Sequence, residues 1–170
     1  IDDLIYSGPG RPYPQTGIFL NDGMKLKQIH DSPGQIIALE QTTNGTIINI
    51  LKEACCCDYF SEYTEIAIYN DSQVDKNVIT FDGNTKITLD KLHITLDKLH
   101  ETEIKGTLRS SPKINDIVKK DDCSEETIKG NHIRYISKLT KVIELTGSGK
   151  WRLVFYPEDK KQSWIGWIRL

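Results

Sequence analysis

The fold of this chain is decided first by the stretch GSGKWRLVFY, residues 147–156, and by WIGWI, residues 164–168. Both stretches are interpreted as β-strands, and Gly147-Ser148-Gly149 suits a hairpin turn. The stretch ISKLTKVIEL, residues 136–145, has the alternating pattern of a strand and precedes them. These three stretches predict successive strands of an all-β domain.

The N-terminal part has the same organisation. Short apolar stretches alternate with Gly and Pro turn signals, and the prolines at 9, 12 and 14 exclude a helix there. Asn21-Asp22-Gly23 predicts a tight turn between residues 18–20 and 24–26, and Thr43-Asn44-Gly45 predicts a second hairpin between residues 35–39 and 46–51. Four or five short strands in this segment indicate a small barrel.

Both ends resemble bacterial SH3 (SH3b) domains. The N-terminal SGPG, residues 7–10, followed by Tyr13-Pro14 and Gly17, is similar to the family's opening R-S-G-P-G-x-x-Y-P. The C-terminal TLRSSP, residues 107–112, resembles L-R-S-G-P, and residues 149–154 and 166–168 resemble its G-x-W-x-x-V … G-W-I/V ending. The first copy departs from the family in having Tyr6 in place of arginine and in lacking the later tryptophans.

The resemblance covers residues 4–51 and 106–170 and implies a mainly β chain with two small SH3-like β-barrels. We expect the first barrel at residues 1–54 and the second at residues 103–170. A mixed α/β connecting segment, residues 55–102, would join them. The second barrel carries an acidic insertion with Asp121, Asp122, Glu125 and Glu126.

The connecting segment contains a heptad duplication, TLDKLH at residues 88–93 and again at 95–100. Its leucines fall at helical spacing and predict a helix over 88–101, although isoleucine and threonine in the same stretch also fit a strand meander. A leucine face of this kind predicts a possible oligomer contact. Its members are Leu89, Leu92, Leu96 and Leu99.

Composition restricts the partners. The formal net charge is −2, the mean hydropathy is −0.43, and no apolar run approaches the ~18 residues that a membrane span needs. The C-terminal third is net basic, but its lysines are scattered, so an ordinary solvated surface is favoured and no nucleic acid is expected. The chain begins at Ile1 and its only methionine is Met24, which fits a removed signal peptide or a trimmed chain; with the resemblance, this predicts a periplasmic or cell-surface location.

The cysteines are Cys55, Cys56, Cys57 and Cys123. The plausible disulfide joins Cys123 to one of the other three, and free thiols are the alternative. Asp122-Cys123-Ser124 resembles the nucleophile motif of NlpC/P60 peptidases. However, glutamates follow in place of glycine and His132 is the only downstream histidine. We therefore expect no enzymatic activity. The cysteines do not form two spaced pairs and the histidines have no close metal-binding spacing, so we also expect no metal site and no cofactor.

Aromatic residues are the best candidates for a binding groove. We expect it to be formed by Tyr13, Pro14, Tyr156, Trp164 and Trp167. Trp164 and Trp167 lie three apart in a predicted strand, so they should point to opposite faces. One of them would then be exposed, or it would pack against the neighbouring module. The resemblance implies a non-enzymatic module that binds peptidoglycan stems or an extended peptide of a partner protein. The alternative is the targeting region of a cell-wall hydrolase whose catalytic domain is not in this chain.

Overall fold

The computed structural model describes residues 3–10, 13–21, 23–55, 59–85, 87, 92, 101–120 and 127–170. The chain is mainly β, and these residues form thirteen strands. The strands are β1 (Leu4–Gly8), β2 (Gln15–Asn21), β3 (Leu26–Pro33), β4 (Gln35–Thr42), β5 (Gly45–Lys52), β6 (Phe60–Tyr69), β7 (Val74–Asp82), β8 (Glu101–Arg109), β9 (Val118–Lys120), β10 (Thr127–Lys129), β11 (His132–Ser148), β12 (Trp151–Pro157) and β13 (Gln162–Arg169).

The local sequence signals for hairpins are confirmed. β2 and β3 pair from Gln15–Pro33 to Asn21–Leu26, on either side of the predicted turn at 21–23. β4 and β5 close through Thr43 and Asn44, since Thr42 is opposite Gly45. Gly45 has a φ of +148°, and a Cβ at this position would overlap the Ile68 carbonyl oxygen, so the glycine is needed for both conformation and space.

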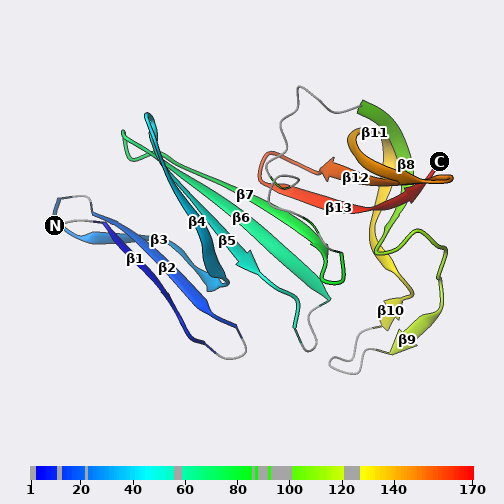
Figure 1. Cartoon of the computed structure of the whole chain (residues 1–170), viewed down its shortest axis with the longest axis horizontal. Helices are drawn as coiled ribbons and strands as arrows, with labels where there is room; N and C mark the ends of the chain where they lie inside the picture. Colours follow the sequence, from blue (N-terminus) through cyan, green and yellow to red (C-terminus); the bar gives the residue numbers. More distant parts are fainter. Residues whose placement is uncertain are drawn as a thin grey trace.

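Two larger sheets organise the molecule. β1, β2 and β3 form an antiparallel sheet at the N-terminal end, seen in blue in Figure 1. A second sheet has the order β12-β11-β8-β13-β7-β6-β5-β4, in which β13 runs parallel to β7 and the other pairs are antiparallel. The expected boundary at residue 54 lies between β5 and β6, which pair along the whole of β5, and the expected boundary at 102 lies inside β8.

The C-terminal strands pair in a closed ring. β12 pairs with β11, β11 with β8, β8 with β13, and β13 returns to β12. This ring lies at the opposite end of the molecule from the N-terminal sheet, and the short β9–β10 hairpin projects beside it (Figure 1). β13 therefore belongs both to the ring and, through β7, to the long sheet.

Three buried clusters follow from the alternation of apolar residues in these strands. One contains Ile18 of β2 with Ile48, Ile50 and Ile66 of the long sheet. The second contains Tyr63, Ile79, Phe81, Leu92, Leu153 and Ile165, with Leu51 packed against it. Because Ile50 and Leu51 are adjacent in β5, these two clusters lie on opposite faces of the long sheet. The third cluster contains Ile104, Leu108, Ile136, Val142, Val154 and Ile168 from all four strands of the ring.

Within the expected connecting segment, residues 55–102, the structure shows the strands β6 and β7. The helix predicted at 88–101 lies outside the described residues except for Leu92 and for Glu101, which begins β8. Leu92 is 7% exposed and belongs to the cluster with Tyr63 and Phe81. The part of the chain that the structure describes contains no helix with the length and apolarity needed to cross a bilayer.

Candidate functional site

Five residues on five neighbouring strands form a cross-strand row on one face of the long sheet. Lys52 of β5 is opposite Glu62 of β6, Glu62 is opposite Thr80 of β7, Thr80 is opposite Trp164 of β13, and Trp164 is opposite Tyr156 of β12. Side chains at paired positions point to the same face. Neighbouring strands are about 4.8 Å apart, so Lys52 and Trp164 are separated by about 14 Å across the sheet.

A pocket lies at the Lys52 end of this row. The Nζ of Lys52 is 5.0 Å from the centroid of the Tyr13 ring, within the range of a cation–π interaction. The Tyr13 hydroxyl donates a hydrogen bond to the Cys55 carbonyl oxygen at 3.1 Å, which fixes the ring against the end of β5. The pocket has a volume of about 230 Å³. Its lining residues are Tyr13, Pro14, Gly34, Gln35, Leu51, Lys52, Glu53, Ala54 and Cys55.

Two hydrogen bonds to backbone carbonyl oxygens hold the segment with Tyr13 and Pro14 in place. The Gly34 N–H donates to the Pro14 carbonyl oxygen at 2.7 Å. The Thr16 hydroxyl, fully buried, donates to the Gly34 carbonyl oxygen at 2.8 Å. Gly34 has a φ of +137°, and a side chain there would press on Ile50. These contacts hold Pro14 and the adjacent Tyr13 against the β3–β4 connection.

An aromatic and charged group lies at the other end of the row. The Phe60 and Trp164 rings meet edge to face, with centroids 6.4 Å apart. The Arg134 guanidinium carbon lies 5.4 Å from the Trp164 ring centroid. The indole Nε1–H donates to Glu158 Oε2 at 2.6 Å, and Arg134 pairs with the other oxygen of the same carboxylate. These contacts fix the orientation of the half-buried indole.

The middle of the row is polar. Thr80 is buried, and its Oγ1 accepts a hydrogen bond from Gln162 Nε2 at 2.9 Å. Gln162 and Glu62 are half-buried. Together with the adjacent Tyr13, Arg134 and Gln162 side chains, the row has an aromatic ring and a cation at each end, with a carboxylate and an amide between them.

The structure separates the five residues predicted to form one groove. Tyr13 and Pro14 line the pocket at the Lys52 end. Tyr156 and Trp164 pack against the third buried cluster, inside the ring of strands, whereas Trp167 packs against the second, on the other face of β13. The expectation that the two tryptophans point to opposite faces is confirmed. Neither of them is exposed: both are half-buried, because a buried cluster lies on each face of β13. Of the two predicted arrangements, an exposed tryptophan or one packed against a neighbouring part of the chain, the structure has the packed one.

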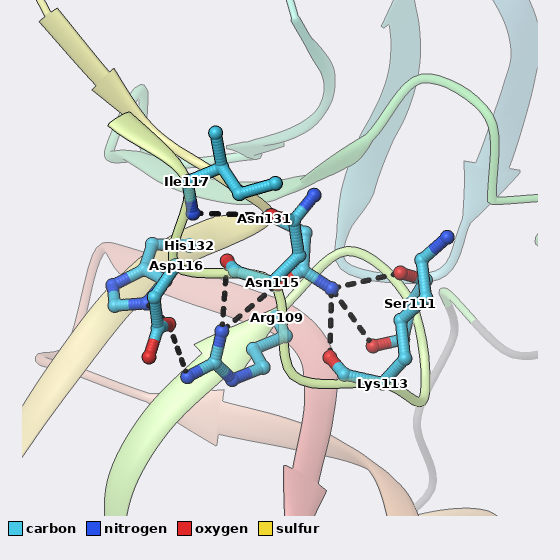
Figure 2. A network of polar contacts seen from close by, with 8 residues as sticks. All are labelled: Arg109, Ser111, Lys113, Asn115, Asp116, Ile117, Asn131 and His132. Carbon is cyan, nitrogen blue, oxygen red and sulfur yellow. Dashed lines mark hydrogen bonds and ion pairs between the residues drawn. The ribbon is translucent and has the colours of Figure 1, made fainter. Parts of the chain in front are cut away.

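A second polar site, shown in Figure 2, holds the loop after β8 to the turn before β11. The buried Arg109 donates hydrogen bonds to Asn131 Oδ1 at 2.9 Å, to the Asn115 carbonyl oxygen at 3.2 Å and to Asp116 Oδ1 at 2.8 Å. Asn131 Nδ2 donates onward to Ser111 Oγ at 2.8 Å and to the Lys113 carbonyl oxygen at 2.9 Å. Arg109 belongs to the stretch 107–112 that resembles the start of an SH3b domain, but nothing in the sequence indicated its hydrogen-bond partners.

The Asp116 carboxylate joins this site to His132, whose Nε2 lies 2.6 Å from Asp116 Oδ1. The hydrogen bonds from His132 and Arg109 hold the pKa of Asp116 below its usual value. Arg109 and Asn131 direct their hydrogen bonds to neighbouring parts of the chain. The arrangement is that of an anchor for residues 110–117.

Other predicted features lie largely outside the described residues. The predicted disulfide joins Cys123 to Cys55, Cys56 or Cys57. Of these four cysteines, the structure describes Cys55 alone, and the acidic residues of the insertion also lie outside the described residues. Leu89, Leu96 and Leu99 are also outside, whereas Leu92 is buried in a cluster of the same chain. Leu92 is therefore not available as an exposed oligomer contact.

Among the described residues, no group of three or more His, Cys, Asp or Glu side chains is arranged to hold a metal ion. In comparisons with known proteins, no family model, no curated protein and no solved structure matches this chain.

Proposed function

We propose that this chain is a non-enzymatic binding module that holds an extended peptide along the cross-strand row between Tyr13 and Trp164. The observation that carries the proposal is the register that aligns Lys52, Glu62, Thr80 and Trp164, with a pocket at the Lys52 end. An extended peptide advances about 3.3–3.6 Å per residue, so a span of about 14 Å accommodates about four residues.

The chemistry of the row suits a short peptide with charged groups. Aromatic rings such as Tyr13 and Trp164 provide contact area at a low entropy cost, as in other aromatic-lined peptide sites. Lys52 and Glu53 line the pocket, and Glu62 is next in the row. A ligand with both carboxylate and amino groups, such as a peptidoglycan stem or a partner's extended segment, matches this mixture of charges.

We extend the proposal to the domain organisation: two SH3-like barrels, as in envelope SH3b domains, in a protein of the periplasm or cell surface. The closed ring of β8, β11, β12 and β13 supports a barrel for the C-terminal part. In the N-terminal part, β5 would be shared between a barrel and the long sheet, since it pairs with both β4 and β6. No cofactor is part of this proposal.

The test is retention of the purified chain on insoluble peptidoglycan at low and moderate salt. Tyr13→Ala, Lys52→Gln and Trp164→Ala should each reduce retention at least tenfold. Trp167→Ala is the matched control, because it removes a half-buried tryptophan of the same strand from the opposite face. Circular dichroism establishes that each variant is folded.

Equal retention of Tyr13→Ala, Lys52→Gln and the wild type would overturn the site, even if Trp164→Ala fails to fold. A wild type that is not retained at either salt concentration would exclude the cell wall as the ligand. The same variants would then be tested against extended peptides of partner proteins.

A further inference from the structure

A separate pocket opens between β8 and β13, in the ring at the C-terminal end. The described pairing of these two strands consists of one position, Trp167 opposite Arg109. A pocket of about 150 Å³ is lined by residues of both strands. Its lining residues are Lys105, Gly106, Thr107, Arg109, Ile114, Trp151, Ile168 and Arg169.

The charge of this lining is entirely positive. It contains Lys105, Arg109 and Arg169 and no carboxylate. The Arg109 charge is already matched by Asp116, at 2.8 Å. Lys105 and Arg169 are exposed, and neither forms an ion pair with any residue of the described ranges. Two unmatched cations therefore flank the same small pocket.

The rest of the lining is apolar. Trp151 is half-buried and is the direct cross-strand neighbour of Arg169. Ile168 is buried, and Ile114 is 57% exposed. Gly106 has a φ of +137°, so a side chain at this position would be strained. The pocket thus combines two cations with an aromatic ring and a branched aliphatic side chain.

We propose that this pocket binds the carboxylate of a short peptide, with Lys105 and Arg169 as the charge partners and Trp151 and Ile114 against the adjoining apolar side chain. Arginine and lysine both form charge-assisted hydrogen bonds with carboxylates. The volume is below the roughly 300–1,000 Å³ of pockets for drug-sized ligands, so the site holds one terminal group rather than a whole ligand. The proposal is independent of the row between Tyr13 and Trp164.

The test is a calorimetric titration with acetyl-alanyl-alanine and, in parallel, with its C-terminal amide. The acid should bind at least tenfold more tightly than the amide, because the amide lacks the charge that Lys105 and Arg169 recognise. The double variant Lys105→Gln with Arg169→Gln should lose at least tenfold of the affinity for the acid. Lys160→Gln with Lys161→Gln removes two exposed lysines elsewhere and should leave it unchanged.

A carboxylate on a side chain is distinguished by acetyl-glutamate amide, which should compete with the acid if either kind of carboxylate is accepted and should not compete if only a terminal one is. Trp151→Phe should weaken binding of the acid. Tyr13→Ala should not, so failure here is separate from failure of the row. Equal binding of acid and amide, or binding of inorganic phosphate as tight as that of the acid, would overturn the proposal.

Discussion

Phe60 of β6 and Trp164 of β13 meet edge to face, with ring planes at 89° and centroids 6.4 Å apart. The contact crosses β7, the strand between them, and it joins the long sheet to the C-terminal ring. Trp164 is at the same time held by Glu158 through its indole nitrogen. One side chain therefore contributes to the contact between the long sheet and the C-terminal ring and to the proposed binding row.

Trp164→Phe should lower the free energy of unfolding by about 1–2 kcal/mol, because it keeps a ring against Phe60 but removes the charge-assisted hydrogen bond to Glu158. Urea denaturation measures the difference. Trp167→Phe is the control, since the described residues give the Trp167 indole no hydrogen-bond partner, and it should cost less. Equal losses in the two variants would show that the Glu158 bond contributes nothing.

Arg109→Met should destabilise the protein by about 3 kcal/mol, because the buried Asn131 Oδ1, the half-buried Asn115 carbonyl and the exposed Asp116 carboxylate all lose the donor that the buried Arg109 provides. The exposed Arg134 provides the comparison: Arg134→Met should cost less than about 1 kcal/mol. Chemical denaturation and hydrogen exchange of residues 110–117 measure the two effects. Unchanged exchange in this loop would contradict the anchoring role of Arg109.

Local features of the fold were predictable from the sequence. The turn at Thr43-Asn44 and the strands at 136–145, 151–156 and 164–168 depend on neighbouring residues, whose side-chain pattern is visible in the sequence. The opposite faces of Trp164 and Trp167 follow from the strand period alone. Features that depend on a single strand or a single turn can therefore be predicted from the sequence alone.

Relationships between distant strands were not predictable in this way. The parallel pairing that sets Thr80 opposite Trp164 depends on the packing of the ring against the long sheet. Without this register, Lys52 and Trp164 have no reason to share a row. Asn131, likewise, is an ordinary turn residue in the sequence, and only the approach of β8 gives it Arg109 as a partner.

Gly130 and Gly149 form a matched pair for testing backbone conformation. Both have left-handed φ values, +55° and +58°, and a Cβ on Gly149 would meet nothing within 4 Å, whereas one on Gly130 would overlap the Asn115 carbonyl oxygen. Gly149→Ala should cost about 1 kcal/mol for conformation alone, and Gly130→Ala should cost clearly more, about 2–3 kcal/mol. Thermal and urea denaturation compare the two variants. Equal losses of stability would show that the turn before β11, which contains Gly130, moves freely away from Asn115.

His30 should make the stability of the protein depend on pH. It is 4% exposed, its Nε2 lies 2.9 Å from Ser32 Oγ, and its Nδ1 has no hydrogen-bond partner among the residues that the structure describes. Burial, with Lys76 in addition, lowers the pKa of His30 to about 4, although Asp31 acts in the opposite direction. Neutral imidazole is therefore the form that the fold accepts.

The sign follows from proton binding. Between pH 6.5, the ordinary histidine pKa, and about 4, the unfolded chain binds a proton at His30 that the folded chain does not. The His30 contribution to stability is therefore complete above pH 6.5 and falls as the pH is lowered towards 4, by at most about 3 kcal/mol. Urea denaturation at pH 7, 5.5 and 4.5 measures this loss. His30→Phe keeps an apolar ring at the site and should flatten the dependence over this range; a variant with the same slope as the wild type would assign the effect to the carboxylates instead.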